Sequence, residues 1–101
     1  MFSGELLREK PLLIPLYVED RLDEGGIPVD LDMLVSLLRE DKITGYIVDS
    51  KVETNIGKVK ELKDKILGLS DPVRIWAMLE SSNIRGLVIS SKVYERLAYG
   101  S

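Results

Sequence analysis

The residues of this chain that could carry out chemistry are carboxylates, hydroxyls and lysines, because it contains no cysteine and no histidine. Zinc sites built from Cys and His, thiol nucleophiles and imidazole bases are therefore excluded. The remaining routes are hard-metal chemistry on Asp and Glu, a Ser–Lys pair, or substrate positioning alone. Serine and lysine are neighbours at 50/51 and 91/92, but adjacent residues do not normally face each other.

A sequence segment near the middle of the chain is repeated, with changes, close to its end. KITGYIVDSKVE (42–53) and NIRGLVISSKVYE (83–95) lie forty-one residues apart, and aligning 30–52 with 71–93 gives seven identities in twenty-three positions. In each of the aligned ranges, 30–52 and 71–93, an aspartate caps a predicted helix. An aliphatic strand follows the helix and ends at serine or aspartate. The pattern indicates an internal helix–strand repeat.

The repeat leads to an expected sheet geometry. Two successive strands joined through helices are usually parallel, and their connection is right-handed. That arrangement would place Asp49 and Ser90 side by side at the C-terminal edge of the sheet. Open α/β folds bind their ligands at this edge, so we expect any chemical site of the chain to lie there.

The positions of the elements follow from periodicity and capping residues. Helices are predicted from about 31 to 38, 58 to 67, 72 to 80 and 92 to 99, buried strands over 43–48 and 84–89, and an edge strand over 11–19. The interpretation of 50–57 stays open between a loop and a returning strand. We expect one small layered α/β domain over 1–101, with a short, mainly parallel sheet and flanking helices. Residues 1–28 would form an N-terminal arm, edge strand and loop, and residues 29–101 the repeated core.

Two segments, YIVDSKV (46–52) and LVISSKVYERL (87–97), resemble the PIN-domain nucleases. Members of that family open with a strand ending in aspartate, and about forty residues later they have a strand followed by a helix that bears a glutamate. The resemblance implies that Asp49 and Glu95 are catalytic carboxylates holding Mg²⁺ or Mn²⁺ for RNA hydrolysis. Such an ion prefers oxygen ligands, and it can activate water and stabilise the departing oxygen.

A longer stretch, residues 27–67, is similar to the adenosyl-nucleotide-binding repeat of cystathionine β-synthase and many regulators. The shared order is strand, helix, strand ending in Val-x-Asp, turn, strand and helix, with Gly57 and Asp64 near the expected places. This resemblance implies a nucleotide-binding regulatory domain. It requires a strand within 50–57, whereas the PIN-like interpretation requires a loop there.

Charge is unevenly distributed along the chain, whose net charge is −3. Residues 1–56 carry twelve acidic and six basic residues, and residues 57–101 carry five acidic and eight basic ones. Opposite signs in the two halves favour head-to-tail association with a second copy or a protein partner. The lysines of the predicted helix 58–67 are candidate contacts for a partner or for RNA: Lys58, Lys60, Lys63 and Lys65.

The leading prediction is therefore a non-catalytic interaction or regulatory domain that works as an oligomer or in a complex and needs no cofactor. No apolar run is long enough to cross a bilayer, and no secretory signal opens the sequence, so we expect a cytoplasmic protein without a membrane partner. The many charges are compatible with a heat-adapted source.

Overall fold

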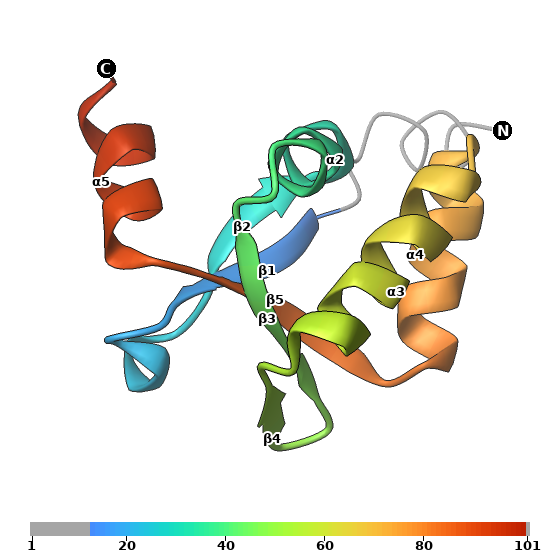
Figure 1. Cartoon of the computed structure of the whole chain (residues 1–101), viewed down its shortest axis with the longest axis horizontal. Coiled ribbons are helices and arrows are strands. Elements are labelled where there is room, and N and C mark those ends of the chain that lie inside the picture. Colours follow the sequence, from blue (N-terminus) through green and yellow to red (C-terminus); the bar gives the residue numbers. More distant parts are fainter. Residues whose placement is uncertain (1–12, 101) are drawn as a thin grey trace, which may run out of the picture.

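A computed structural model of the protein describes residues 13–100 as a single sheet of five strands with helices packed against it (Figure 1). Residues 1–12, which belong to the predicted N-terminal arm, and Ser101 lie outside the described residues. In chain order the elements are β1 (Leu13–Val18), the 3-10 turn η1 (Leu22–Glu24), β2 (Ile27–Asp30), α2 (Leu31–Arg39), β3 (Ile43–Val48), β4 (Lys51–Glu53), α3 (Ile56–Gly68), α4 (Pro72–Ser81), β5 (Ile84–Ile89) and α5 (Ser91–Tyr99).

The sheet is mixed and mostly antiparallel, with the strand order β2-β1-β5-β3-β4. Only β1 and β5 run parallel, while β1–β2, β5–β3 and β3–β4 are antiparallel pairs. The α/β class is confirmed, but the prediction of a mainly parallel sheet is wrong, and the predicted internal repeat is not supported. The physical reason is the path of the chain between β3 and β5, which contains a hairpin strand and two helices instead of one helical crossover.

The register of β3 and β5 fixes which residues meet at each end of the sheet. Ile43 pairs with Ile89, and Val48 pairs with Ile84, so the end of β3 lies beside the start of β5. The expectation that Asp49 and Ser90 lie side by side is therefore wrong. The two residues follow the C-terminal ends of antiparallel neighbours and lie at opposite ends of the sheet.

Four helices begin where a polar side chain accepts a backbone N–H of the first turn, as capping residues do. The caps are Asp30 for α2, Asn55 for α3, Asp71 for α4 and Ser90 for α5. In α4 the next residue, Pro72, stands at the first helical position, where its missing N–H costs nothing. The predicted starts of α2 and α4 are thereby confirmed.

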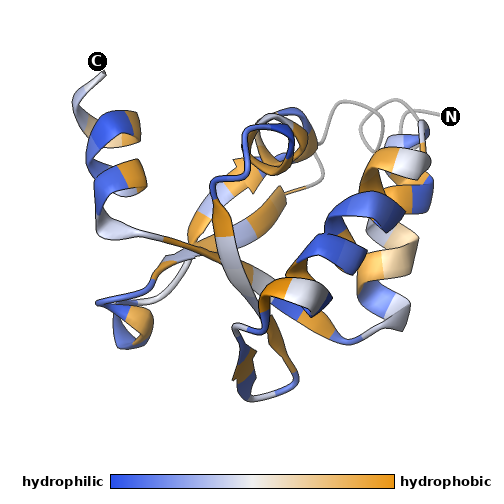
Figure 2. Cartoon of the chain, in the orientation of Figure 1, coloured by the Kyte–Doolittle hydropathy of each residue, from blue (hydrophilic) through white to orange (hydrophobic). Residues whose placement is uncertain are grey.

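The hydrophobic core lies between one face of the sheet and three helices, α2, α3 and α4. It joins alternate residues of the central strands to the buried stripes of the helices: Ile14, Leu16, Leu31, Leu34, Leu37, Leu38, Ile43, Leu62, Ile66, Ile75, Leu79, Leu87 and Ile89. Figure 2 shows hydrophobic residues along the strands and hydrophilic residues on the outer side of α3. Burial of this face is the main stabilising contribution that the described residues make.

The last helix is placed differently from the others. Figure 1 shows α5 at one end of the molecule and α3 and α4 at the other. None of the α5 residues is buried, although Val93 and Tyr94 pack partly against the core. Within residues 13–100 no helix is long and apolar enough to cross a membrane.

Candidate binding grooves

One end of the sheet brings together the turn after α2, the start of β3 and the start of α5. The chain leaves α2 through Asp41, whose φ of 57° is left-handed and whose N–H donates to the Leu38 carbonyl oxygen at 3.1 Å. The next N–H, that of Lys42, donates to the Leu37 carbonyl oxygen at 2.9 Å. These bonds satisfy carbonyl groups that the end of a helix leaves open. The turn therefore holds Lys42 in a defined place beside β3.

Two contacts from the loop after β1 fix the orientation of α5. The Ser91 hydroxyl donates a hydrogen bond to the Asp20 carboxylate. The guanidinium carbon of Arg21 lies 5.0 Å from the centroid of the Tyr94 ring, a cation–π distance. Ser91 and Tyr94 are three residues apart and so share one side of the helix. The opposite side of α5 is left to face the turn after α2.

A groove of about 620 Å³ lies between that side of α5 and the turn after α2, and we name it the α5 groove. Its lining residues are Asp41, Lys42, Thr44, Ser90, Lys92, Val93, Glu95, Arg96 and Tyr99. The volume is within the range of small-ligand sites. Tyr99 forms part of its wall while exposing 78% of its surface.

The α5 groove is a local concentration of positive charge in an acidic chain. Lys42, Lys92 and Arg96 form no ion pair with any other residue from 13 to 100. The carboxylate of Asp41 is already bound to Lys63, whose Nζ lies 2.6 Å from its Oδ1. This hydrogen bond and the charge of the ammonium lower the pKa of the Asp41 carboxyl. Glu95 is the other carboxylate of the lining, and against three cations it leaves the groove with a net positive charge. The groove can therefore attract a negatively charged group.

A strongly acidic segment lies on the other side of α5. We name residues 19–24 the acidic loop; it carries four exposed carboxylates, those of Glu19, Asp20, Asp23 and Glu24. None of them forms an ion pair with another described residue. The single cation of the loop, Arg21, is half-buried and stacks on Tyr94. The acidic loop and the α5 groove thus present opposite charges on two sides of one helix.

A second groove, of about 610 Å³, lies between the end of α2, the start of β3 and the first turns of α3, and we name it the α3 groove. Its lining is mainly apolar, with lysines at the side: Leu38, Asp41, Ile43, Thr44, Ile56, Val59, Lys60 and Lys63. Leu38 and Ile43 are buried in the core, whereas Ile56 exposes 84% of its surface. The groove therefore combines a fixed apolar floor with an exposed apolar wall.

The structure does not bring together the two carboxylates that the PIN-like resemblance implies. Asp49 follows β3 at the end where β5 begins, and Glu95 lies on the helix that follows the other end of β5. A strand of six residues separates these ends by about 20 Å. In the described part of the chain, no three residues among His, Cys, Asp and Glu are grouped as metal ligands. A metal site on Asp49 and Glu95 remains a prediction from sequence alone.

Residues 51–53 form β4, so the segment left open between loop and strand contains a strand. From β2 to α3 the order is strand, helix, strand, strand and helix, which is the order that the adenosyl-nucleotide-binding repeat requires. In the sheet, however, β2 is separated from β3 by β1 and β5. Nucleotide binding by this stretch also remains a prediction.

The four lysines of α3 do not form one surface. Lys60 and Lys63 line the α3 groove, whereas Lys58 and Lys65 line a different depression over β3 and α4. Two of the four lysines are ion-paired, Lys63 with Asp41 and Lys58 with Glu53. The helix therefore offers less unpaired positive charge than its composition indicates.

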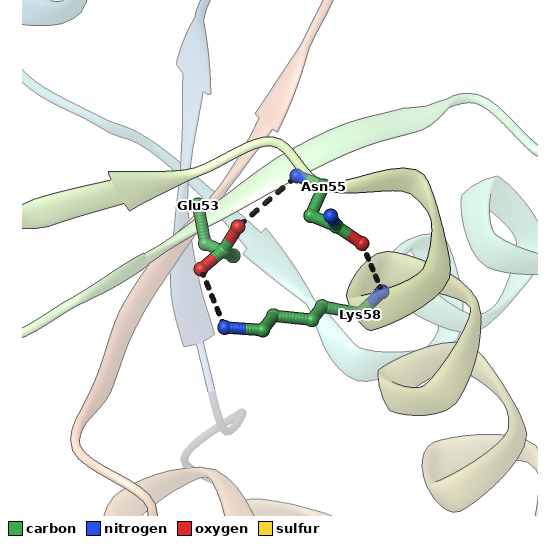
Figure 3. A network of polar contacts seen from close by, with 3 residues as sticks. All are labelled: Glu53, Asn55 and Lys58. Atoms are coloured by element: carbon green, nitrogen blue, oxygen red, sulfur yellow. Dashed lines mark hydrogen bonds and ion pairs between the residues drawn. The ribbon is translucent and has the colours of Figure 1, made fainter.

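Figure 3 shows the ion pair between Glu53 and Lys58, which lies at the start of α3. The Glu53 carboxylate accepts the backbone N–H of Asn55 at 3.1 Å and lies 3.3 Å from the Lys58 ammonium. The Asn55 side chain accepts the backbone N–H of Lys58 at 3.1 Å. The hydrogen bond from Asn55 lowers the pKa of Glu53, and Lys58 lowers it further. This network is structural, since it caps the helix.

Sequence reasoning named Lys60, Lys63 and Glu95, which line the grooves, but it missed the other lining residues. Lys42 and Arg96 are more than fifty positions apart, and only the antiparallel pairing of β3 with β5 brings their elements together. The one signal in the sequence was Ser90, which caps α5 and so sets the direction of that helix. Comparisons with protein-family models, curated protein sequences and solved structures gave no match.

Proposed function

We propose that this protein is a small non-catalytic interaction domain whose copies associate head to tail. In this arrangement the acidic loop of one copy occupies the α5 groove of the next. The observation that carries the proposal is the pairing of opposite charges on two sides of α5. Three cations and one carboxylate, Glu95, line one side, and four exposed carboxylates lie on the other, none of them in an ion pair with another described residue.

The charges account for both attraction and specificity. Two opposite unit charges 4 Å apart attract by about 1 kcal/mol in water and by about 4 kcal/mol near a protein surface. Several such pairs are needed because each exposed pair contributes little on its own. Asp23 and Glu24 stand at the tip of the acidic loop, in the 3-10 turn η1, where they can reach a neighbouring molecule. The α5 groove offers them Lys92 and Arg96.

The symmetry of the assembly follows from the use of two different surfaces. A contact between unlike patches is heterologous, and it generates a closed ring or an open chain of copies. A symmetric dimer, in which both copies use the same patch, is not expected. Association should weaken as salt is added, because exposed charges are screened over about 10 Å at 0.1 M ionic strength.

The test is sedimentation velocity at about 20 mM and about 500 mM salt, with paired charge reversals. The loop variant is Asp23→Lys with Glu24→Lys, and the groove variant is Lys92→Glu with Arg96→Glu. Each variant alone should sediment as a monomer at low salt. An equimolar mixture of the two should associate again, because each reversed surface finds its complement on the other protein.

A matched control for the loop variant changes the net charge by the same amount and in the same direction, at two residues elsewhere. Asp64→Lys with Glu80→Lys reverses two exposed carboxylates on α3 and α4, outside both proposed surfaces. This control should associate as the wild type does. The proposal is wrong if the wild type is monomeric at low salt at every concentration, or if the mixture of the two variants stays monomeric.

A further inference from the structure

The α3 groove has the composition of a site for an amphiphile and not for a polar ligand. Its floor is formed by Leu38 and Ile43, both buried, and its wall by Val59 and Ile56. Its volume, about 610 Å³, lies within the range of small-molecule sites. An apolar lining with few polar groups is the usual composition of such sites.

Ile56 is the most exposed large hydrophobic residue among those that the structure describes. It is the first residue of α3 and leaves 84% of its surface in water. The cap that starts α3 sits on the preceding residue, Asn55, so the position itself does not require an apolar side chain. Its exposure costs free energy that a ligand in the α3 groove would recover.

The rim of the α3 groove supplies one available cation. Lys63 is bound to Asp41 across the groove at 2.6 Å, which neutralises both groups. Lys60, one turn after Ile56, is exposed and has no ion pair with another residue of the described chain. Asp41 is the single carboxylate in the lining, and it is already paired. A ligand of the α3 groove therefore needs one negatively charged group, placed where it can pair with Lys60.

We propose that the α3 groove binds a small amphiphilic anion, an alkyl carboxylate being the simplest case. The alkyl chain lies on the floor of Leu38 and Ile43 and against Ile56, and the carboxylate pairs with Lys60. This site adjoins the α5 groove, with which it shares Asp41 and Thr44. No residue of the variants that test the head-to-tail contact lines the α3 groove.

The experiment is a titration of the full chain, labelled with ¹⁵N, using octanoate, octanol and acetate as probes below their aggregation concentrations. Octanoate should shift the amide signals of residues around the α3 groove at the lowest concentration. Octanol should bind about fivefold or more weakly, because it lacks the charge, and acetate should not bind, because it lacks the chain. Equal binding of octanoate and octanol by the wild type would overturn the proposal.

Two variants with matched controls locate the site. Ile56→Thr should weaken octanoate binding about tenfold, while Val73→Thr, an equivalent change at an exposed residue in the first turn of α4, should not. Lys60→Gln should reduce octanoate to the affinity of octanol, while Lys65→Gln on the same helix should not. Unchanged binding in Ile56→Thr or in Lys60→Gln would overturn the proposal. So would shifts of the Ile56, Val59 and Lys60 signals when the protein is concentrated without octanoate, because these residues line the α3 groove but not the α5 groove, and a second copy would then occupy the α3 groove.

Discussion

The backbone N–H of Asp49 donates a hydrogen bond to the carbonyl oxygen of Asn83, with 3.0 Å between the two heavy atoms. This bond links the residue after β3 to the residue before β5 and continues the antiparallel pairing of the two strands. Asp49, which sequence reasoning placed at a chemical site, is thus the first residue of the two-residue turn between β3 and β4. Its φ of 56° is left-handed.

The first prediction concerns this turn. A left-handed φ costs an ordinary L-residue about 1–2 kcal/mol but costs glycine nothing. Asp49→Gly should therefore be at least as stable as the wild type, and Asp49→Ala should be about 1 kcal/mol less stable than Asp49→Gly. Urea denaturation followed by circular dichroism measures both.

Asp64, an exposed residue in the interior of α3, provides the control for the turn, because its backbone is helical. There the order should reverse, with the alanine variant about 1 kcal/mol more stable than the glycine variant. If alanine were also the better residue at position 49, the role assigned to the left-handed φ would be refuted.

The second prediction concerns Gly86 in β5, over which the ring of Tyr17 lies. A Cβ atom at position 86 would stand 2.5 Å from a carbon of that ring, closer than atoms can approach. Gly86→Ala should therefore destabilise the fold by about 1–3 kcal/mol, the usual cost of overpacking. The cost should shrink when Tyr17 is also replaced by leucine, because the two sites are coupled.

Gly68, the last residue of α3, serves as the matched position for that substitution. Nothing lies within 4 Å of the Cβ that alanine would add there. Gly68→Ala should stabilise the protein by about 0.5–1 kcal/mol, since alanine favours the helix. If the two substitutions by alanine changed the stability equally, the contact with Tyr17 would not be what excludes a side chain at position 86.

The third prediction uses the ion pair between Asp41 and Lys63, which lowers the pKa of the Asp41 carboxyl. A carboxyl with a lower pKa in the folded state stabilises the fold above its unfolded pKa, and this contribution is lost as pH falls through the folded pKa. Asp41→Asn should therefore lower the urea midpoint at about pH 7, and the difference should shrink as pH falls below about 4. Asparagine tolerates the left-handed φ of this position, so the backbone is kept.

Asp64→Asn is the control for this pH series, because Asp64 is exposed and has no ion pair with a described residue. Its midpoint should follow that of the wild type throughout. A deficit of Asp41→Asn that stayed constant from about pH 7 to about pH 3 would show that the ion pair is not its cause.

The elements of this fold could be predicted because they depend on neighbours in sequence. Asp30 and Asp71 cap helices, Pro72 occupies a first helical position, and the strands 43–48 and 84–89 were placed correctly. Helix α3 begins two residues earlier than predicted because Asn55 caps it. These features arise from short-range hydrogen bonds and apolar periodicity.

The directions of the strands could not be predicted, because they depend on the path of the chain as a whole. The turn at Asp49 sends the chain back into β4, a strand of three residues with little apolar pattern of its own. The ion pairs made by the lysines of α3 could not be predicted for a similar reason. Asp41 and Glu53 bind Lys63 and Lys58, pairings that a reading of α3 by itself does not reveal.

The parallel pairing of β1 with β5 also bears on how the protein is made. Leu16 at the start of the described chain pairs with Leu87 near its end, and both strands lie in the interior of the sheet. Contacts between residues so far apart form late, because closing a long loop costs entropy before the contacts repay it. During synthesis β1 can pair with β2 early, but its other edge stays unpaired until the ribosome has released β5. Until then, the emerging chain keeps an apolar strand exposed, which makes this the stage most open to aggregation or to chaperone binding.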